Sequence, residues 1–200
     1  MSEASELHSA RLEEYKSLRE EVLLHIKLER QILALTGTVF FLALTFAAKF
    51  LPESHADIWS IVIMILLTPL FALYRAELFA IAKIASYIEE FIEPNVKGLR
   101  WTGTHIQGVK RFDKASPRAP FKISSHQAAG IYFVVLLVVA WALPWVFDGC
   151  TPSWTSLGAM AILSFIYILN LASLLRYGSH RERWQNVWKT IASEDSGGRN

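Results

Sequence analysis

Three polar side chains in or beside the apolar stretches of this sequence could do chemistry. Glu77, His126 and Asn170 each lie inside or within a few residues of an apolar run. A carboxylate, an imidazole and an amide that converge in a membrane cavity could move protons or bind an ion. A small membrane enzyme or transporter is therefore one hypothesis, and it requires these three groups to meet.

The sequence offers few other residues for catalysis or metal binding. The six His residues are scattered, and no two have the i, i+4 spacing with a neighbouring Glu that is typical of a helical zinc site. Cys150 is the only Cys, so the chain cannot form an intrachain disulfide or a site of several thiolates. We expect no catalytic residue, no bound metal and no cofactor.

A basic segment is the strongest candidate binding surface. Residues 97–122 hold seven Lys or Arg and one acid, Asp113, with Trp101, Phe112 and Phe121 among them. Beside a membrane, such a segment fits anionic lipid headgroups, at about 1 kcal/mol per basic residue. A cytosolic protein or an acidic ligand is the alternative partner, and we expect no nucleic acid. The candidate binding residues are Lys110, Arg111, Lys114, Arg118 and Lys122.

Four apolar runs of the sequence must position the polar and basic residues described above. Each run has about 17–21 residues, the length that crosses a hydrocarbon layer of about 30 Å as a helix. The runs cover residues 32–51, 58–74, 128–147 and 155–175, and none has a charge near its centre. The whole chain is 52% hydrophobic and only 19% charged, which is apolar for a soluble domain. The sequence predicts an all-α integral membrane protein with four spans in two hairpins.

The polar segments complete the predicted organisation. We expect residues 1–31 to form a long amphipathic cytoplasmic helix that continues into the first span. Residues 75–93 are expected to extend the second span as a cytoplasmic helix, which Pro94 ends. Residues 94–127 form the basic cytoplasmic loop and residues 176–200 the cytoplasmic tail.

The basic residues predict the orientation. Nineteen of the 20 Lys and Arg residues fall in the N-terminal segment, the central segment or the tail, and Lys49 is the exception. The connections 52–57 and 148–154 are short and carry no Lys or Arg. The positive-inside rule then predicts that both termini and the basic loop are cytoplasmic. In a bacterium, the protein would lie in the inner membrane.

An apolar stripe follows one face of the N-terminal helix. Its members are spaced three or four residues apart, the period of a helix. They are Leu12, Tyr15, Leu18, Val22 and Ile26. The stripe either packs on the cytoplasmic helices of the same chain or forms a coiled-coil seam between subunits. Both alternatives stay open, although the stripe is short for a coiled coil.

Polar and small residues within the spans predict packing features. Thr68 and Pro69 are expected to bend the second span, because proline removes a backbone donor and clashes with the preceding turn. Gly158 and Ala161 belong to a small-residue face that lets helices approach closely. Asn170 is expected to make an interhelical hydrogen bond rather than to bind an ion.

Two stretches carry a resemblance to known proteins. Residues 14–22 (EYKSLREEV), followed by 30–32, are similar to the start of a group of small, uncharacterised bacterial four-span membrane proteins. Residues 74–77, then 87–93 (YIEEFIE) and 98–101, are similar to the central region of that group. The long helix that leads into a membrane hairpin also resembles the membrane effector modules of bacterial anti-phage systems. That architectural resemblance implies an effector-like role.

Three functional hypotheses follow from these observations. The first is a non-enzymatic membrane protein that self-associates, with a pore-like, scaffold-like or effector-like role. The second is a membrane-anchored sensor or accessory subunit that holds a cytosolic partner or acidic ligand on the basic loop. The third is the small enzyme or transporter. The first hypothesis predicts a defined oligomer. The second predicts partner capture that depends on the basic residues, and the third predicts a cavity in which the polar groups converge.

Overall fold

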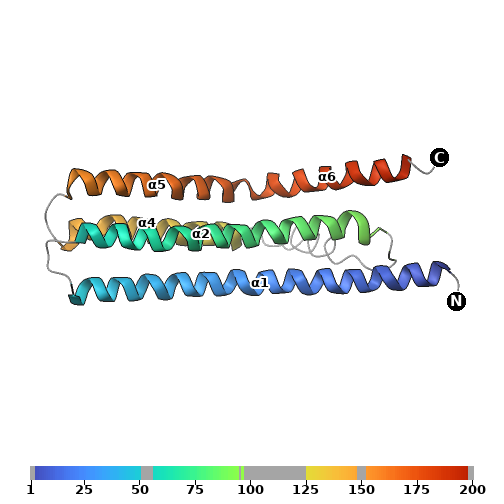
Figure 1. Cartoon of the computed structure of the whole chain (residues 1–200), viewed down its shortest axis with the longest axis horizontal. Helices are drawn as coiled ribbons and strands as arrows, with labels where there is room; N and C mark the ends of the chain where they lie inside the picture. The colour runs from blue at the N-terminus through green and yellow to red at the C-terminus, as the bar shows by residue number, and fades with distance from the viewer. Residues whose placement is uncertain (1–2, 51–55, 95, 97–124, 148–151, 198–200) are drawn as a thin grey trace, which may run out of the picture. The chain divides into compact units, whose positions relative to one another are not determined.

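The computed structural model describes residues 3–50, 56–94, 96, 125–147 and 152–197. Within these residues the regular structure is helical, in agreement with the predicted all-α class. The helices are α1 (Glu3–Phe50), α2 (Ala56–Tyr87), α4 (Ser125–Phe147), α5 (Trp154–Leu175) and α6 (Tyr177–Gly197), and a π-helical turn, η2 (Ile88–Ile92), directly follows α2 (Figure 1). Four of them, α1, α2, α4 and α5, are long and apolar enough to cross a membrane.

Local sequence explains where several of these helices begin and end. α1 has 48 residues and continues across the predicted boundary at residue 31. The end of η2 is closed by the backbone N–H of Glu93, which donates to the carbonyl of Ile88, and Pro94 follows. At the start of α5, the Ser153 side chain accepts a hydrogen bond from the backbone N–H of Ser156 at 3.1 Å, as a helix N-cap does.

Pro69 lies inside α2 without ending it. The hydroxyl of the preceding residue, Thr68, donates to the carbonyl of Met64 at 2.7 Å, so this polar group is satisfied within its own helix. The continuity of α2 through Pro69 is compatible with the packing role that the sequence suggests for both residues. The bend expected at Pro69 stays a prediction.

The chain divides into two compact units. One unit consists of residues 1–27, 77–122 and 177–200, and we call it the polar unit. The other consists of residues 28–76 and 123–176, and we call it the apolar unit. Both α1 and α2 contribute to each unit, whereas α6 belongs to the polar unit and α4 and α5 to the apolar unit.

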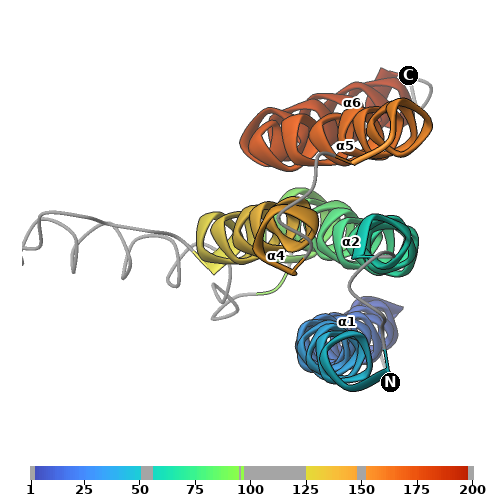
Figure 2. The ribbon, with the colours of Figure 1, turned by 90° about the vertical axis from the view of Figure 1, so that its left-hand side faces the viewer.

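In the apolar unit, α2 and α4 lie side by side between α1 and α5 (Figure 2). Its core contains a cluster of aromatic rings. The rings of Phe71 on α2 and Phe133 on α4 stack with centroids 4.2 Å apart, and Tyr167 on α5 lies 4.8 Å from Phe71. The hydroxyl of Tyr167 donates to the carbonyl of Phe133 at 2.9 Å. These contacts hold three of the four apolar helices together.

The outer surface of the apolar unit carries large apolar side chains. Phe41 is 68% exposed, Ile162 65% and Phe165 61%. A soluble protein rarely exposes a continuous apolar surface of this kind. The exposure has a direct explanation if hydrocarbon chains surround these helices, because lipid is as apolar as the side chains themselves.

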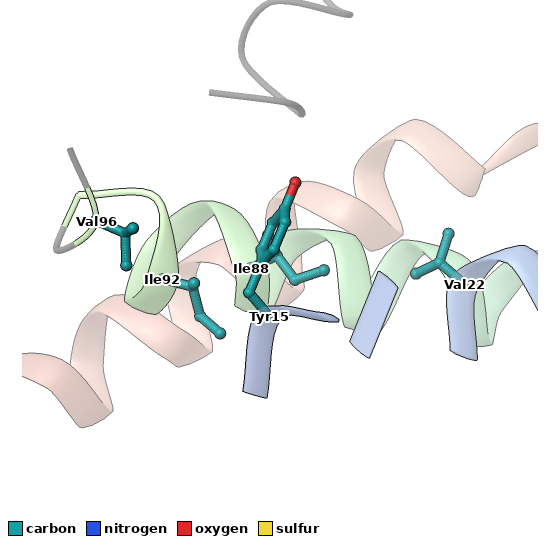
Figure 3. Close-up of a cluster of buried hydrophobic side chains, with 5 residues drawn as sticks. All are labelled: Tyr15, Val22, Ile88, Ile92 and Val96. Atoms are coloured by element: carbon teal, nitrogen blue, oxygen red, sulfur yellow. The ribbon is translucent and has the colours of Figure 1, made fainter. Parts of the chain in front are cut away.

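In the polar unit, the end of α2 and η2 lie between the first part of α1 and α6 (Figure 1). A small apolar cluster joins α1 to η2 (Figure 3). It consists of Tyr15, Val22, Ile88, Ile92 and Val96, and each is at most 4% exposed. Leu18 and Ile26 pack against the cluster. The stripe of the N-terminal helix therefore packs within the chain, which is the first of the two alternatives left open by the sequence.

Candidate functional site

A close pair of titratable side chains joins α1 to α2 inside the polar unit. His25 Nδ1 lies 2.5 Å from Glu77 Oε2, and each side chain is 20% exposed. On the other edge of the ring, His25 Nε2 lies 3.9 Å from Glu21 Oε1, one helical turn earlier on α1. The imidazole thus lies between two carboxylates, one from each helix.

In this arrangement, a hydrogen bond between His25 and Glu77 joins the two helices. A neutral imidazole that carries its proton on Nδ1 donates to the Glu77 carboxylate, and a protonated imidazole also has a donor toward Glu21. In both protonation states the ring and Glu77 form a charge-assisted hydrogen bond, which is stronger than a neutral one. The direct consequence is a tie between α1 and α2.

A second polar contact joins the same two helices further along the polar unit. The hydroxyl of Tyr87 donates to Glu14 Oε1 at 2.8 Å. Burial, the hydrogen bond to Glu14 and the charge of Glu14 all raise the pKa of Tyr87. The phenol therefore remains a protonated donor at physiological pH, and the contact persists.

Within the polar unit, Glu89 connects η2 to α6. Its Oε2 accepts from Arg181 Nη2 at 2.8 Å and from Gln185 Nε2 at 2.9 Å. Arg181 and Gln185 are one helical turn apart on α6, so both reach the same carboxylate. The ring of Trp188, which follows on the same side of α6, lies 5.3 Å from that of Tyr87. Tyr87 thus contacts both neighbouring helices.

In the apolar unit, a polar pair joins α1 to α2 as well. The hydroxyl of Tyr74 donates to Glu29 Oε1 at 3.1 Å. Tyr74 is completely buried, and its ring lies 5.5 Å from that of Phe133. Glu29 thereby attaches α1 to the aromatic core of this unit.

The three groups required by the enzyme or transporter hypothesis have other surroundings. Glu77 belongs to the polar unit and pairs with His25. Asn170 is buried in the apolar unit, and its amide nitrogen donates to the carbonyl of Ile166 at 3.0 Å. His126 lies in α4, and its side chain is outside the described residues. Each of the two described groups thus has a partner in its own unit.

The partner described for Asn170 is local. Ile166, whose carbonyl accepts from the amide nitrogen, lies one turn earlier in α5 itself. A side-chain donor that bonds back to the carbonyl at i−4 is satisfied within its own helix. The interhelical hydrogen bond expected for Asn170 stays a prediction. Tyr167 and Trp141 do make hydrogen bonds between α4 and α5, and Trp141 Nε1 donates to Ser164 Oγ at 2.6 Å.

The five basic residues of the candidate binding surface lie outside the described residues. They are Lys110, Arg111, Lys114, Arg118 and Lys122. Their partner, whether lipid headgroups, a cytosolic protein or an acidic ligand, stays a prediction. Cys150 also lies outside the described residues.

Sequence reasoning named Glu77 but not its partner His25, and it did not single out Glu89 or Arg181. A signal for His25 exists in retrospect. It lies three residues after Val22, a member of the apolar stripe, so it borders the face of α1 that packs on α2. No comparable local signal marks Arg181, because its partner is 92 positions away in the chain.

No protein-family model, curated protein or solved structure matches this chain. Its helices place it in a broader class. Four long apolar helices are those of a multi-pass integral membrane protein. The resemblance to small bacterial membrane proteins and to anti-phage effector modules stays a prediction.

Proposed function

We propose that this protein is a non-enzymatic, four-span membrane protein that self-associates in the bilayer, as a pore-like or effector membrane subunit. In this proposal the spans form two hairpins, and both termini, the basic loop and the polar unit are cytoplasmic. The distribution of Lys and Arg supports that orientation. The titratable pairs between helices can act as contacts that hold neighbouring helices together, so the proposal requires no catalysis.

The exposed small residues on the outward face of α5 are the observation that best supports self-association. A Cβ built on Gly158 would have no neighbouring atom within 4 Å, and Gly158, Ala161 and Phe165 are exposed on one side of the helix. Small residues on a lipid-facing surface let the backbone of a second helix approach closely, which stabilises helix association where no hydrophobic driving force exists. A second copy of α5 fits this face.

The mass of the protein in lipid nanodiscs tests the proposal. We expect a closed oligomer for the native chain and a monomer for Gly158→Ile, because a branched side chain there holds the second helix away. Ala34→Ile is the matched control, since Ala34 is an exposed small residue on α1. A monomeric native protein would overturn self-association, and an unchanged oligomer in Gly158→Ile would overturn the α5 face.

Ion flux across liposomes then separates a pore from a scaffold. The groups deep in the spans are uncharged, so a conduction path would form between subunits and be gated by an apolar constriction. Flux in the native protein that disappears in the monomeric Gly158→Ile variant would support the pore. Flux that persists in the monomer would contradict it.

The basic loop supports a second candidate function, a sensor or accessory subunit with a cytosolic acidic partner. Residues 97–122 hold seven basic residues against one acid, and this charge would attract an acidic partner. Replacement of Lys110, Arg111, Lys114, Arg118 and Lys122 by Gln should abolish capture of an acidic partner and leave membrane insertion intact. Capture that survives this replacement would rule the loop out as the binding surface.

A further inference from the structure

Within the polar unit, aromatic rings and one carboxylate attach α6 to α2 and η2. The ring of His180 stacks on Phe79 at 4.3 Å, Lys83 Nζ lies 5.2 Å from the centroid of Trp184, and Trp188 lies 6.0 Å from Phe91. The hydrogen bonds described between α6 and η2 converge on a single carboxylate oxygen of Glu89. These hydrogen bonds therefore share one acidic group.

The attached face of α6 leaves nitrogen atoms unsatisfied. His180 Nδ1, Arg181 Nε and Trp188 Nε1 are buried and have no hydrogen-bond partner among the described residues. Buried polar atoms are nearly always hydrogen-bonded in native structures, because an unpaired one loses its interaction with water and gains nothing. Three such atoms on one helix indicate that this face has a better-suited partner than α2 and η2.

The composition of α6 identifies the chemistry of that partner. Residues 176–191 carry Arg176, Arg181, Arg183 and Lys189 against one acid, Glu182. The face with Trp184 and Trp188 also presents Val187 and Ile191, which are about 40% exposed. A helix with Trp and aliphatic residues on one face and basic residues around it suits an anionic bilayer surface, where headgroup oxygens accept from Trp and Arg nitrogens.

Chain connectivity makes that surface accessible. α5 ends at Leu175 and α6 begins at Tyr177, so only Arg176 separates the helix from a span. At Arg176 the backbone leaves the helical conformation, with φ −85° and ψ 10°, so α5 and α6 are separate helices joined by this one residue. We propose that α6 is a detachable strap that exchanges between the α2–η2 surface and a membrane leaflet rich in anionic lipid. The inference rests on the proposed membrane insertion.

The test uses the full chain in vesicles of phosphatidylcholine, with or without phosphatidylglycerol. In a Cys150→Ser background, bimane is attached to Lys83→Cys, where Trp184 quenches it while α6 is docked. We expect quenching in neutral vesicles and its loss in anionic ones, with recovery in high salt because salt screens the attraction to headgroups. A Trp184→Phe variant gives the unquenched baseline. Equal quenching in both vesicles would overturn the proposal.

A second readout identifies where α6 goes. A nitroxide on Ile191→Cys should gain accessibility to oxygen and lose accessibility to a water-soluble nickel complex in anionic vesicles, as for a label in the bilayer interface. Loss of bimane quenching with higher nickel accessibility would mean release into water, and would overturn the membrane as partner. Flotation of the protein with both vesicles reports insertion separately, so failure to insert is distinguishable from failure of the strap.

Matched variants test the role of Glu89. Glu89→Gln removes the negative charge that holds Arg181, so α6 should detach at a lower fraction of phosphatidylglycerol than in the native chain. Glu90→Gln is the control, because it makes the same change on the adjacent residue of η2. Identical lipid dependence in the two variants would contradict the assignment of Glu89 as the anchor.

Discussion

Gly37 of α1 lies directly against the hydroxyl of Tyr132 of α4 in the apolar unit. A Cβ built on Gly37 would be 2.8 Å from Tyr132 Oη, a distance that real Cβ atoms essentially never show. The absence of a side chain at residue 37 therefore lets the tyrosine reach the backbone of α1. Small residues have this use in membrane helices, where van der Waals packing contributes much of the association.

We expect Gly37→Ala to destabilise the apolar unit by about 1–3 kcal/mol, the range typical of overpacking. Thermal unfolding in nanodiscs measures the loss. Tyr132→Phe removes the hydroxyl oxygen that the new methyl group would meet, so the double variant should recover much of the stability. Additive losses in the double variant would show that the methyl group collides with something else.

The His25–Glu77 pair predicts coupled effects on the polar unit. Removal of either partner, by His25→Ala or Glu77→Gln, should reduce stability by about 1 kcal/mol, since charged hydrogen bonds contribute somewhat more than this when fully buried. The double variant should lose little more than either single variant. Hydrogen exchange of the α2 amides from residue 77 onward measures the effect, and exposed Glu20→Gln is the control. Independent effects would contradict a direct tie.

The aromatic core of the apolar unit predicts a sharp contrast between two phenylalanines. Phe71 is completely buried against Phe133 and Tyr167, whereas Phe41 is 68% exposed on α1. Phe71→Ala should cost roughly 3 kcal/mol, because a cavity remains among the helices. Phe41→Ala should leave the thermal midpoint almost unchanged, since lipid fills the space. Equal losses would mean that Phe41 is not lipid-facing.

The predicted orientation can be tested with the native thiol. Cys150 is the only Cys and lies in the connection between the third and fourth spans, on the side predicted to be outside. A membrane-impermeant maleimide should label it in intact cells that express the protein. Cys150→Ser combined with Ser2→Cys should be labelled only after the membrane is permeabilised. Labelling of the N-terminal thiol in intact cells would reverse the topology.

The sequence by itself determined the membrane class of this protein. Runs such as 128–147 and 155–175 have the length and composition of spans, and hydrocarbon requires a helix there because each backbone group must be satisfied within the segment. The stripe through Tyr15 and Val22 likewise shows by its helical period which face of α1 packs. These features are local, so a reading of neighbouring residues is sufficient to find them.

Only the tertiary structure decided which polar groups meet. His25 and Glu77 are 52 positions apart, and Arg181 and Glu89 are 92 apart, so nothing in either local sequence reveals the partner. Asn170 shows a local contact by comparison, because its amide nitrogen donates to the carbonyl of Ile166 in its own helix. Pairing across helices depends on the rotation of each helix about its axis and on its register along its neighbour. Many side chains together set that rotation and register, and no single run of sequence contains them.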